Sequence, residues 1–330
     1  MRSLWNNRTA RPYLLLVIMI AVFSALGGDT VLTVATLRSV LQHFATLGPV
    51  ALGLGLTILA RNFDLSVAGV VGLAGCVAVL AGGTYPVVGV LAAVAIGAIF
   101  GIVQGTIIVR MNLSSIGVTL GGLLTATGLA YVATGNQEIR LANANIPPIM
   151  DDPLIGPMSL RFLVTLAMFA VAAIAVARTR AGRDLLAAGS DPKAALVAGV
   201  PVNRVIIIAF MLAGICTALG GALLSFSLAA ASPLPLSNTL VPAAAAAIIG
   251  GVSLRGGRGN PLGIAGGVLV LSALQSCLTA LRVEPFVQDI VTGGVLFLVG
   301  IMDGAELRRR LNDVYRRAGR GAFRRGAPSA

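Results

Sequence analysis

The stretch PVVGVLAAVAIGAIFGIVQGTIIV, residues 86–109, runs for 24 residues without a charged side chain. A helix needs about 20 mostly apolar residues to cross the hydrocarbon core of a bilayer. Within a single segment a helix also satisfies its own backbone hydrogen bonds, which lipid cannot do. Residues 86–109 therefore predict a membrane-spanning helix.

Similar runs recur along the whole chain. Hydrophobic residues make up 57% of the 330 residues and charged residues 11%, whereas a soluble domain carries about 25% charged residues. The sequence therefore predicts an all-α fold, a polytopic membrane helix bundle of about ten transmembrane helices. The predicted spans are residues 12–30, 40–60, 64–83, 86–109, 113–134, 160–177, 205–228, 238–254, 261–281 and 285–303. Span 40–60 contains Pro49, and span 238–254 is short and rich in alanine.

The basic residues favour one orientation of these spans. With ten alternating spans and a cytoplasmic N-terminus, 20 of the 24 basic residues fall on cytoplasmic segments, as the positive-inside rule requires. Both termini are then cytoplasmic. We predict a basic N-terminal segment at 1–11, a single transmembrane domain at 12–303 and a basic tail at 304–330. Anionic membrane lipid is also expected to attract this tail. The start of the chain resembles a signal peptide, but we interpret it as an uncleaved first span, because its loss would move the tail to the other side.

Glycine residues repeat every four positions in several spans. Such small-residue faces let two helix backbones approach closely, which is a common way for helices to pack in membranes. The pattern predicts a compact bundle. The repeats are Gly97, Gly101 and Gly105, then Gly117 with Gly121, and Gly263 with Gly267.

The sequence lacks the residue patterns that metal, catalytic, phosphate-binding and nucleic-acid-binding sites require. The three cysteines form no CxxC pair and His43 is the lone histidine, so we predict no metal site and no catalytic site. The glycine-rich residues 250–263, GGVSLRGGRGNPLG, lack the order of a phosphate-binding loop, and we interpret them as a tight turn. No nucleic-acid-binding motif accompanies the arginines. We therefore expect a chain that is not an enzyme, binds no nucleic acid and has no cofactor of its own.

Polar side chains inside the predicted spans are candidates for a transport path, because each is costly to place in lipid. Asp64 has a second interpretation: it stands near a predicted helix end, where Asp and Ser also act as caps. The residues that we assign to a translocation path are Asn62, Asp64, Gln104, Asn112, Thr119 and Gln275.

The longest predicted cytoplasmic loop covers residues 178–204. In its centre, the Asp191-Pro192 pair is typical of a helix start, and Gly199 is typical of a helix end. The pattern predicts a short helix outside the bilayer. This helix is either a docking element for a partner or a solvated connector.

Five stretches of the chain resemble the permease subunits of bacterial ATP-binding-cassette importers for simple sugars, the ribose, xylose, arabinose and galactoside group. The stretches keep the family's order and cover most of residues 50–303. They are DLSVAGVVGLAG (64–75), TLGGLLTATGLAYVATG (119–135), GRDLLAAGSDPKAALVAGVPVNRV (182–205), AAAIIGGVSLRGGRGNPLG (245–263) and PFVQDIVTGGVLFLVGIMD (285–303).

This resemblance implies that the 178–204 loop carries a coupling helix that docks on an ATPase subunit. It also implies that the ATPase partner binds ATP and Mg, that a periplasmic binding protein delivers the solute, and that a second permease copy completes a homodimer. The implied location is the bacterial inner membrane. The residues implied for coupling are Gly189, Asp191, Lys193, Ala194, Ala195, Gly199 and Val200.

The sequence departs from the family pattern at two places. Where the family usually has Gly-Gly-Ile before DLS, this chain has Arg61, Asn62 and Phe63, and residues 126–128 replace a triplet that usually contains arginine. The solute class therefore stays open among pentoses, hexoses, nucleosides and polyols. A branched-chain amino acid permease is the nearest alternative.

Two alternatives belong to other classes of protein. An ion-coupled carrier would need paired acidic residues or broken helices at the membrane midplane, for which Asp64, Asp289 and Pro49 are the candidates. A membrane-embedded enzyme would need clustered His, Asp or Glu, and the sequence has one histidine.

Overall fold

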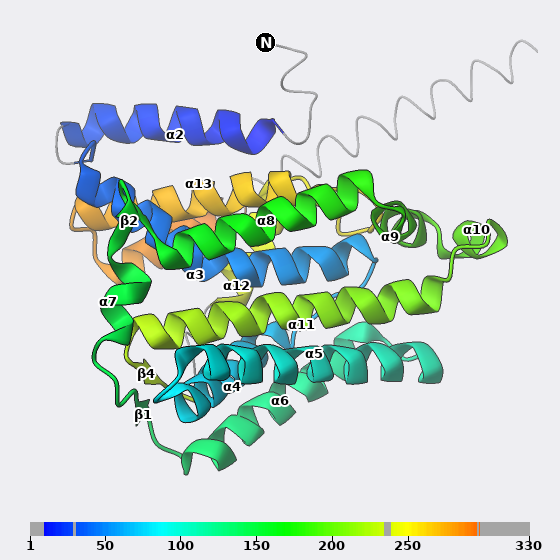
Figure 1. The fold of residues 1–330 in the computed structure, drawn as a ribbon. Helices are drawn as coiled ribbons and strands as arrows, with labels where there is room; N and C mark the ends of the chain where they lie inside the picture. Colours follow the sequence, from blue (N-terminus) through cyan, green and yellow to red (C-terminus); the bar gives the residue numbers. More distant parts are fainter. Residues whose placement is uncertain (1–9, 29–30, 234–238, 296, 298–330) are drawn as a thin grey trace, which may run out of the picture. The chain divides into compact units, whose positions relative to one another are not determined.

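A computed structural model describes residues 10–28, 31–233, 239–295 and 297 of the chain. The chain divides into two compact units, Met1–Arg282 and Val283–Ala330. The first unit is a bundle of helices with two small strand pairs (Figure 1). Its elements are α2 (Arg11–Gly27), α3 (Val34–Leu59), α4 (Val67–Gly82), α5 (Pro86–Met111), α6 (Ser115–Thr134), β1 (Ile139–Arg140), α7 (Ile146–Asp151), β2 (Pro153–Ile155), β3 (Met158–Ser159), α8 (Leu160–Arg178), α9 (Arg180–Ser190), α10 (Pro192–Val197), α11 (Val202–Ser227), β4 (Ala230–Ala231), α12 (Leu240–Ile249) and α13 (Pro261–Ala280).

Six of the described helices, α3, α5, α6, α8, α11 and α13, are long and apolar enough to cross a membrane. The helices α2, α4 and α12 are apolar but shorter. The prediction of an all-α, polytopic membrane bundle is confirmed. In the second unit, residues 285–295 and 297 are helical, while residues 296 and 298–303 of the predicted span, the tail at 304–330 and residues 1–9 lie outside the described residues. The predicted domain boundaries stay predictions.

Two predicted spans differ from the helices that form. The helix α3 starts at Val34, six residues before the predicted span, and continues through Pro49. The helix α12 has only ten residues, a length of about 15 Å, whereas the hydrocarbon core is about 30 Å thick. The prediction that residues 238–254 form one complete membrane-crossing helix is therefore wrong. The helix α12 ends just before Gly251, which takes a positive φ of 84°.

The buried core of the first unit centres on α3 and α11. Among the residues of α3, Ala51, Leu52 and Leu54 have no exposed surface. A proline inside a helix removes one backbone hydrogen bond, yet α3 tolerates Pro49, whose ring packs against Gly220 of α11. This tertiary contact helps to explain why the helix continues through a proline.

Glycines hold α5 against α11. A Cβ on Gly97 would overlap the backbone of Gly214, and a Cβ on Gly101 would overlap the carbonyl of Phe210. The Gly263–Gly267 pair of α13 packs in the same way on α12. Gly117 and Gly121 of α6 have no such neighbour within the described chain. Two of the three predicted glycine faces are therefore helix contacts of this chain.

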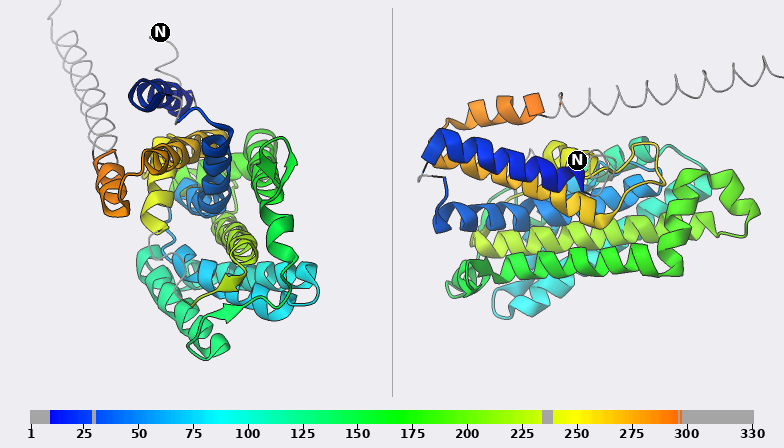
Figure 2. Two further views of the ribbon diagram at one scale, coloured as in Figure 1. Left: turned by 90° about the vertical axis from the view of Figure 1, so that its left-hand side faces the viewer. Right: turned by 90° about the horizontal axis from the view of Figure 1, so that it is seen from above.

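Two short strand pairs, which the sequence did not predict, lie at one end of the bundle. β1 pairs with β4 and β2 pairs with β3, both antiparallel. They lie beside α7, whereas α9 and α10 lie at the other end (Figure 1). We refer to these as the α7 end and the α10 end. Figure 2 gives two further views of the same arrangement.

Replacing Arg61 with glycine is expected to stabilise the protein. Arg61 follows the end of α3 and has a φ of 62°, a left-handed conformation that costs a residue with a Cβ about 1 kcal/mol. Glycine avoids this cost, and it is the residue that the resemblance places here. Arg61→Gly should therefore raise the temperature at which the detergent-solubilised protein unfolds. Arg61→Ala removes the same charge but keeps the Cβ, so an equal gain in that variant would contradict the explanation.

Candidate functional site

The link between α3 and α4, residues 60–66, enters the interior of the bundle without forming a helix. Hydroxyl groups of α6 satisfy its backbone. The amide of Phe63 donates to Ser115 Oγ at 3.2 Å, and the amide of Leu65 donates to Thr119 Oγ1 at 3.1 Å. Non-helical backbone is tolerated at membrane depth only where protein groups or a cavity surround it. Such breaks often form solute sites in transporters.

A buried polar network begins at Asp64 in this link. Asp64 is 3% exposed, and its Oδ1 accepts hydrogen bonds from the amide of Ser66 at 2.9 Å and the hydroxyl of Ser66 at 2.6 Å. Gln104 of α5 donates from Nε2 to Ser66 Oγ at 2.9 Å. Asp64 thus holds Ser66, the residue before α4, but it accepts no hydrogen bond from the first turn of the helix, and no side chain in the described part of the chain caps α4. It also connects α4 to α5 deep in the bundle.

Gln104 is the least satisfied member of this network. Its side chain is 4% exposed and packs against Gly122 of α6, and its Oε1 has no hydrogen-bond partner among the described residues. A buried amide oxygen without a partner costs about 1–3 kcal/mol. Within the described residues, the network therefore contains one unsatisfied hydrogen-bond acceptor, Gln104 Oε1, where α4, α5 and α6 meet.

The network lies about halfway along the bundle. Asp64, Ser66 and Gln104 line a small void together with Gly214 and Thr217. Gly214 lies twelve residues into α11, about 18 Å along the helix axis from the α10 end. The void is too small for a water molecule. The side chains around Asp64 are therefore closely packed.

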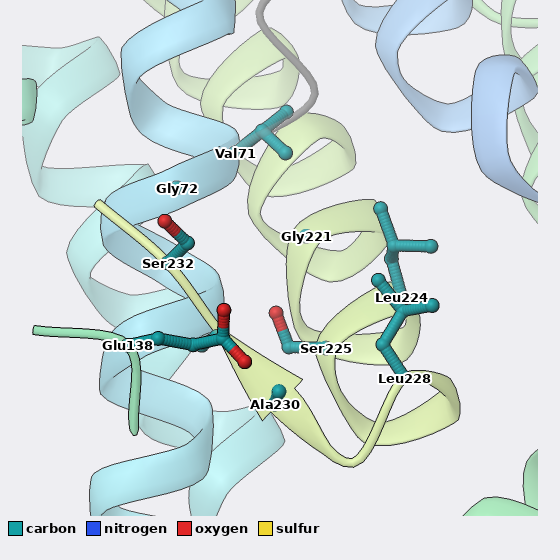
Figure 3. A pocket seen from close by; sticks show the side chains of 10 residues that line it. Val71, Gly72, Glu138, Gly221, Leu224, Ser225, Leu228, Ala230 and Ser232 are labelled. Atoms are coloured by element: carbon teal, nitrogen blue, oxygen red, sulfur yellow. The ribbon is translucent and has the colours of Figure 1, made fainter. Parts of the chain in front are cut away.

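A larger pocket of about 270 Å³ lies further along α4 and α11, toward the α7 end. Val70 lines the small void, and the next two residues, Val71 and Gly72, line this pocket. Figure 3 shows oxygen atoms of Glu138, Ser225 and Ser232 facing its interior. Its walls combine apolar surface with a few polar groups, as small-molecule sites usually do.

An ion pair fixes α7 to the neighbouring helices at this end. Arg161 of α8 is 5% exposed, lies 3.0 Å from the carboxylate of Asp151 and donates to Gln42 Oε1 of α3. The Asp151 carboxylate also accepts from Ser227 of α11, and the Asp151 carbonyl accepts from Arg38 at 2.7 Å. Breaking a buried pair leaves an uncompensated charge, so this cluster holds α3, α7, α8 and α11 in one arrangement.

The predicted helix in the 178–204 loop is confirmed as α10. The Asp191 side chain accepts from the amides of Lys193 and Ala194, Pro192 is the first helical residue, and Gly199 follows the helix with a φ of 83°. Val200 donates its amide to the carbonyl of Ala195. The sequence did not predict α9, the longer helix that precedes α10.

The end of α9 packs on two distant parts of the chain. A Cβ on Gly189 would overlap the carbonyl oxygen of Leu59, the last residue of α3. The same carbonyl accepts the amide of Gly257 at 2.9 Å, and Ser190 Oγ donates to the Gly257 carbonyl at 3.3 Å. The glycine-rich residues 250–263 do form a turn, between α12 and α13, and this turn supports α9.

The helix α10 extends beyond the ends of α8 and α11 (Figure 1). Ala195 faces the chain and is buried, whereas Lys193 and Ala194 are exposed. Two apolar side chains point outward: Leu196 is 65% exposed and Val197 is 91% exposed. Adjacent exposed apolar residues on a projecting element suit a protein contact.

The predicted path residues separate into two groups. Asn62, Asp64, Gln104 and Thr119 gather around the α3–α4 link. Asn112 is an exposed residue at the end of α5 with a φ of 51°, and Gln275 lies on α13, which packs chiefly on α3 and α12. Whether those two residues line a path stays a prediction.

Other polar groups of the site were missed by the sequence analysis. Ser66 lay inside the DLS motif, and Arg161 was counted only for its charge. Glu138, Ser225 and Ser232 come from separate loops and helices, so no local pattern joins them. Within the described ranges, no group of three or more His, Cys, Asp or Glu side chains could hold a metal ion.

Comparisons with known proteins agree with this architecture. The family model described as "Branched-chain amino acid transport system / permease component" matches residues 36–300. The chain is similar to the autoinducer 2 import permease LsrC of Enterobacter, 31% identical over 94% of this chain and 90% of LsrC. It is similar to the ribose import permease RbsC of Escherichia coli K12, 30% identical over 87% of this chain and 91% of RbsC. It is also similar to the L-arabinose permease AraH of Azospirillum brasilense, 29% identical over 82% of this chain and 80% of AraH.

No solved structure matches the chain. The family match covers most of the sequence, and the relatives align with it over nearly their full length. The helices α4 to α13, the projecting α10 among them, and the α3–α4 link lie within the matched residues, whereas α2 precedes them. The chain is a multi-pass protein of the inner membrane, and it belongs to the family of permease subunits of ATP-binding-cassette importers that includes these sugar permeases.

Proposed function

We propose that this permease moves a simple sugar, or a related polyol or nucleoside, across the membrane. The observation that carries the proposal is the pocket of about 270 Å³, which lies along α4 and α11 next to the void beside Asp64. Carboxylate and hydroxyl oxygens of Glu138, Ser225 and Ser232 suit the hydroxyl groups of a sugar. The relatives named for arabinose, ribose and fructose support the same solute class.

The energy source that we propose is a partner ATPase, which binds ATP and Mg and docks on α10. The exposed Leu196 and Val197 support this contact. Gly189, Asp191, Lys193, Ala194, Ala195, Gly199 and Val200 form or support the docking helix. A periplasmic binding protein delivers the solute at the α7 end. No covalent step takes place in this chain.

The topology that we propose has ten membrane segments, of which the segment around α12 crosses only partly as a helix, and both termini lie in the cytoplasm. The α10 end then faces the cytoplasm, where ATP is available, and the pocket opens toward the periplasm. The excess of basic residues in the predicted cytoplasmic segments supports this orientation.

A reconstitution experiment tests the solute and the energy source together. The tagged permease is purified gently from its native membrane with whatever proteins accompany it. We expect a Walker-motif ATPase to accompany it, and uptake of labelled ribose or arabinose into proteoliposomes to require ATP and the binding protein. ATP-driven uptake of leucine instead of sugars would favour the branched-chain alternative. Uptake by the purified chain alone, driven by an ion gradient, would favour the carrier.

A second copy of the chain is the partner that we propose for the exposed face of α6. In the part of the chain that the structure describes, no neighbour lies within 4 Å of a Cβ placed on Gly117 or Gly121, and Leu124 beside them is 73% exposed. In the other two glycine repeats the same spacing packs a helix.

Cysteine cross-linking checks this homodimer. In a variant without the native cysteines, Gly121→Cys should give disulfide-linked dimers in oxidised membranes. Ile174→Cys, at an exposed position on α8, is the matched control and should stay monomeric. Cross-linking through Ile174→Cys but not Gly121→Cys would place the second copy on another face.

A further inference from the structure

A deep apolar groove runs between α8 and α11 near the α10 end. Its volume is about 600 Å³ and its wall is almost entirely apolar. Leu56 of α3 forms part of the groove, and residues of α9 line one end. Val171 of α8 and Ile208 of α11 line it and remain 68% and 46% exposed. A groove of this kind in a membrane protein must be filled by something apolar.

The groove is long enough to cross the hydrocarbon part of one leaflet of the bilayer. On α11 its lining extends from Arg204 to Leu219, fifteen residues or about 22 Å along the helix axis. Half of the hydrocarbon core is about 15 Å thick. One extended lipid chain therefore has room to lie along the groove, with its head group near Arg204.

The polar end of the groove carries positive charge. Arg204 lines it, is exposed and makes no ion pair with any residue that the structure describes. Asp184 also lines this end, but its carboxylate lies 4.0 Å from Arg180. Arg183 is exposed on the same helix. The local excess of arginine suits an anionic group such as a lipid phosphate.

We propose that the groove is a binding site for an anionic phospholipid, with one acyl chain between α8 and α11 and the phosphate on Arg204. The length, the apolar wall and the unpaired charge at one end favour a lipid over a polypeptide, whose backbone would find few hydrogen-bond partners there. This site is separate from the pocket and the network proposed for the solute.

Native mass spectrometry of the gently solubilised permease tests the proposal. The wild type should retain one phospholipid per chain, enriched in anionic lipid over the membrane average. Ala172→Trp fills the groove and should lower the retained fraction by roughly tenfold, an effect of about 1.4 kcal/mol. Ala170→Trp, on the same helix but outside the groove, should retain the lipid. Arg204→Gln, which leaves the packing intact, should weaken the anionic preference about fivefold.

Equal lipid retention in the two tryptophan variants would overturn the site, because the lipid would then be bound elsewhere on the surface. A photo-reactive residue in place of Val171 identifies the occupant. Attachment of a phospholipid mass supports the proposal. Attachment of a peptide, from a second copy or from residues 283–330, overturns it and makes the groove a protein contact.

Discussion

Replacing Gly101 with valine is expected to remove most of the folded permease from the membrane. A Cβ at this position would overlap the carbonyl group of Phe210 and lie 2.8 Å from the Cα of Met211. Both obstacles are backbone atoms, so no side chain can rotate to make room. Overpacking costs about 1–3 kcal/mol or more, which is a large part of the 5–15 kcal/mol that stabilises a typical protein.

The amount of monodisperse protein after detergent extraction measures this effect. Ala170→Val is the matched control, because it places the same residue in a membrane helix, α8, at an exposed position. The control should be extracted like the wild type. An equal loss in both variants would assign the effect to valine in a helix rather than to the contact between α5 and α11.

The double substitution Leu196→Asp with Val197→Asp is expected to abolish ATP-driven uptake while leaving the permease folded. Both side chains are mostly exposed, so their replacement removes little packing from the chain itself. An apolar contact with the ATPase would be lost and two charges would be buried at the interface. Central contact residues contribute about 2 kcal/mol or more each, so we expect docking to weaken about 100-fold or more.

Co-purification of the ATPase measures the docking directly. The control is Leu154→Asp with Ile155→Asp, another adjacent pair of exposed apolar residues, located in β2 at the α7 end. This control should keep the ATPase. If the ATPase stays bound to the α10 variant as well, docking on Leu196 and Val197 is wrong, although the permease function itself would stand.

The features that the sequence predicted well depend on local chemistry. A long apolar run predicted the helix α5, and the Asp191-Pro192 pair predicted the start of α10. The glycine spacing of α5 and α13 predicted close contacts with neighbouring helices. In each case the residues that decide the element lie within a few positions of one another.

The site itself was predicted only in part, because it depends on contacts between distant residues. Hydropathy placed Asp64 at the edge of a span, yet the link that carries it reaches the middle of the bundle. The hydroxyl groups that accept hydrogen bonds from the backbone of this link belong to Ser115 and Thr119, more than fifty residues away. The pocket lined by Gly72, Glu138 and Ser225 is likewise assembled from separate parts of the chain.

The contact between Gly189 and the carbonyl of Leu59 has a mechanical consequence. No atom fits between α9 and the end of α3, and the same carbonyl accepts the amide of Gly257. A force that displaces α9 must therefore displace the end of α3 as well. Only four residues separate Leu59 from Asp64, so a push on the loop would reach the middle of the bundle through a very short segment of chain.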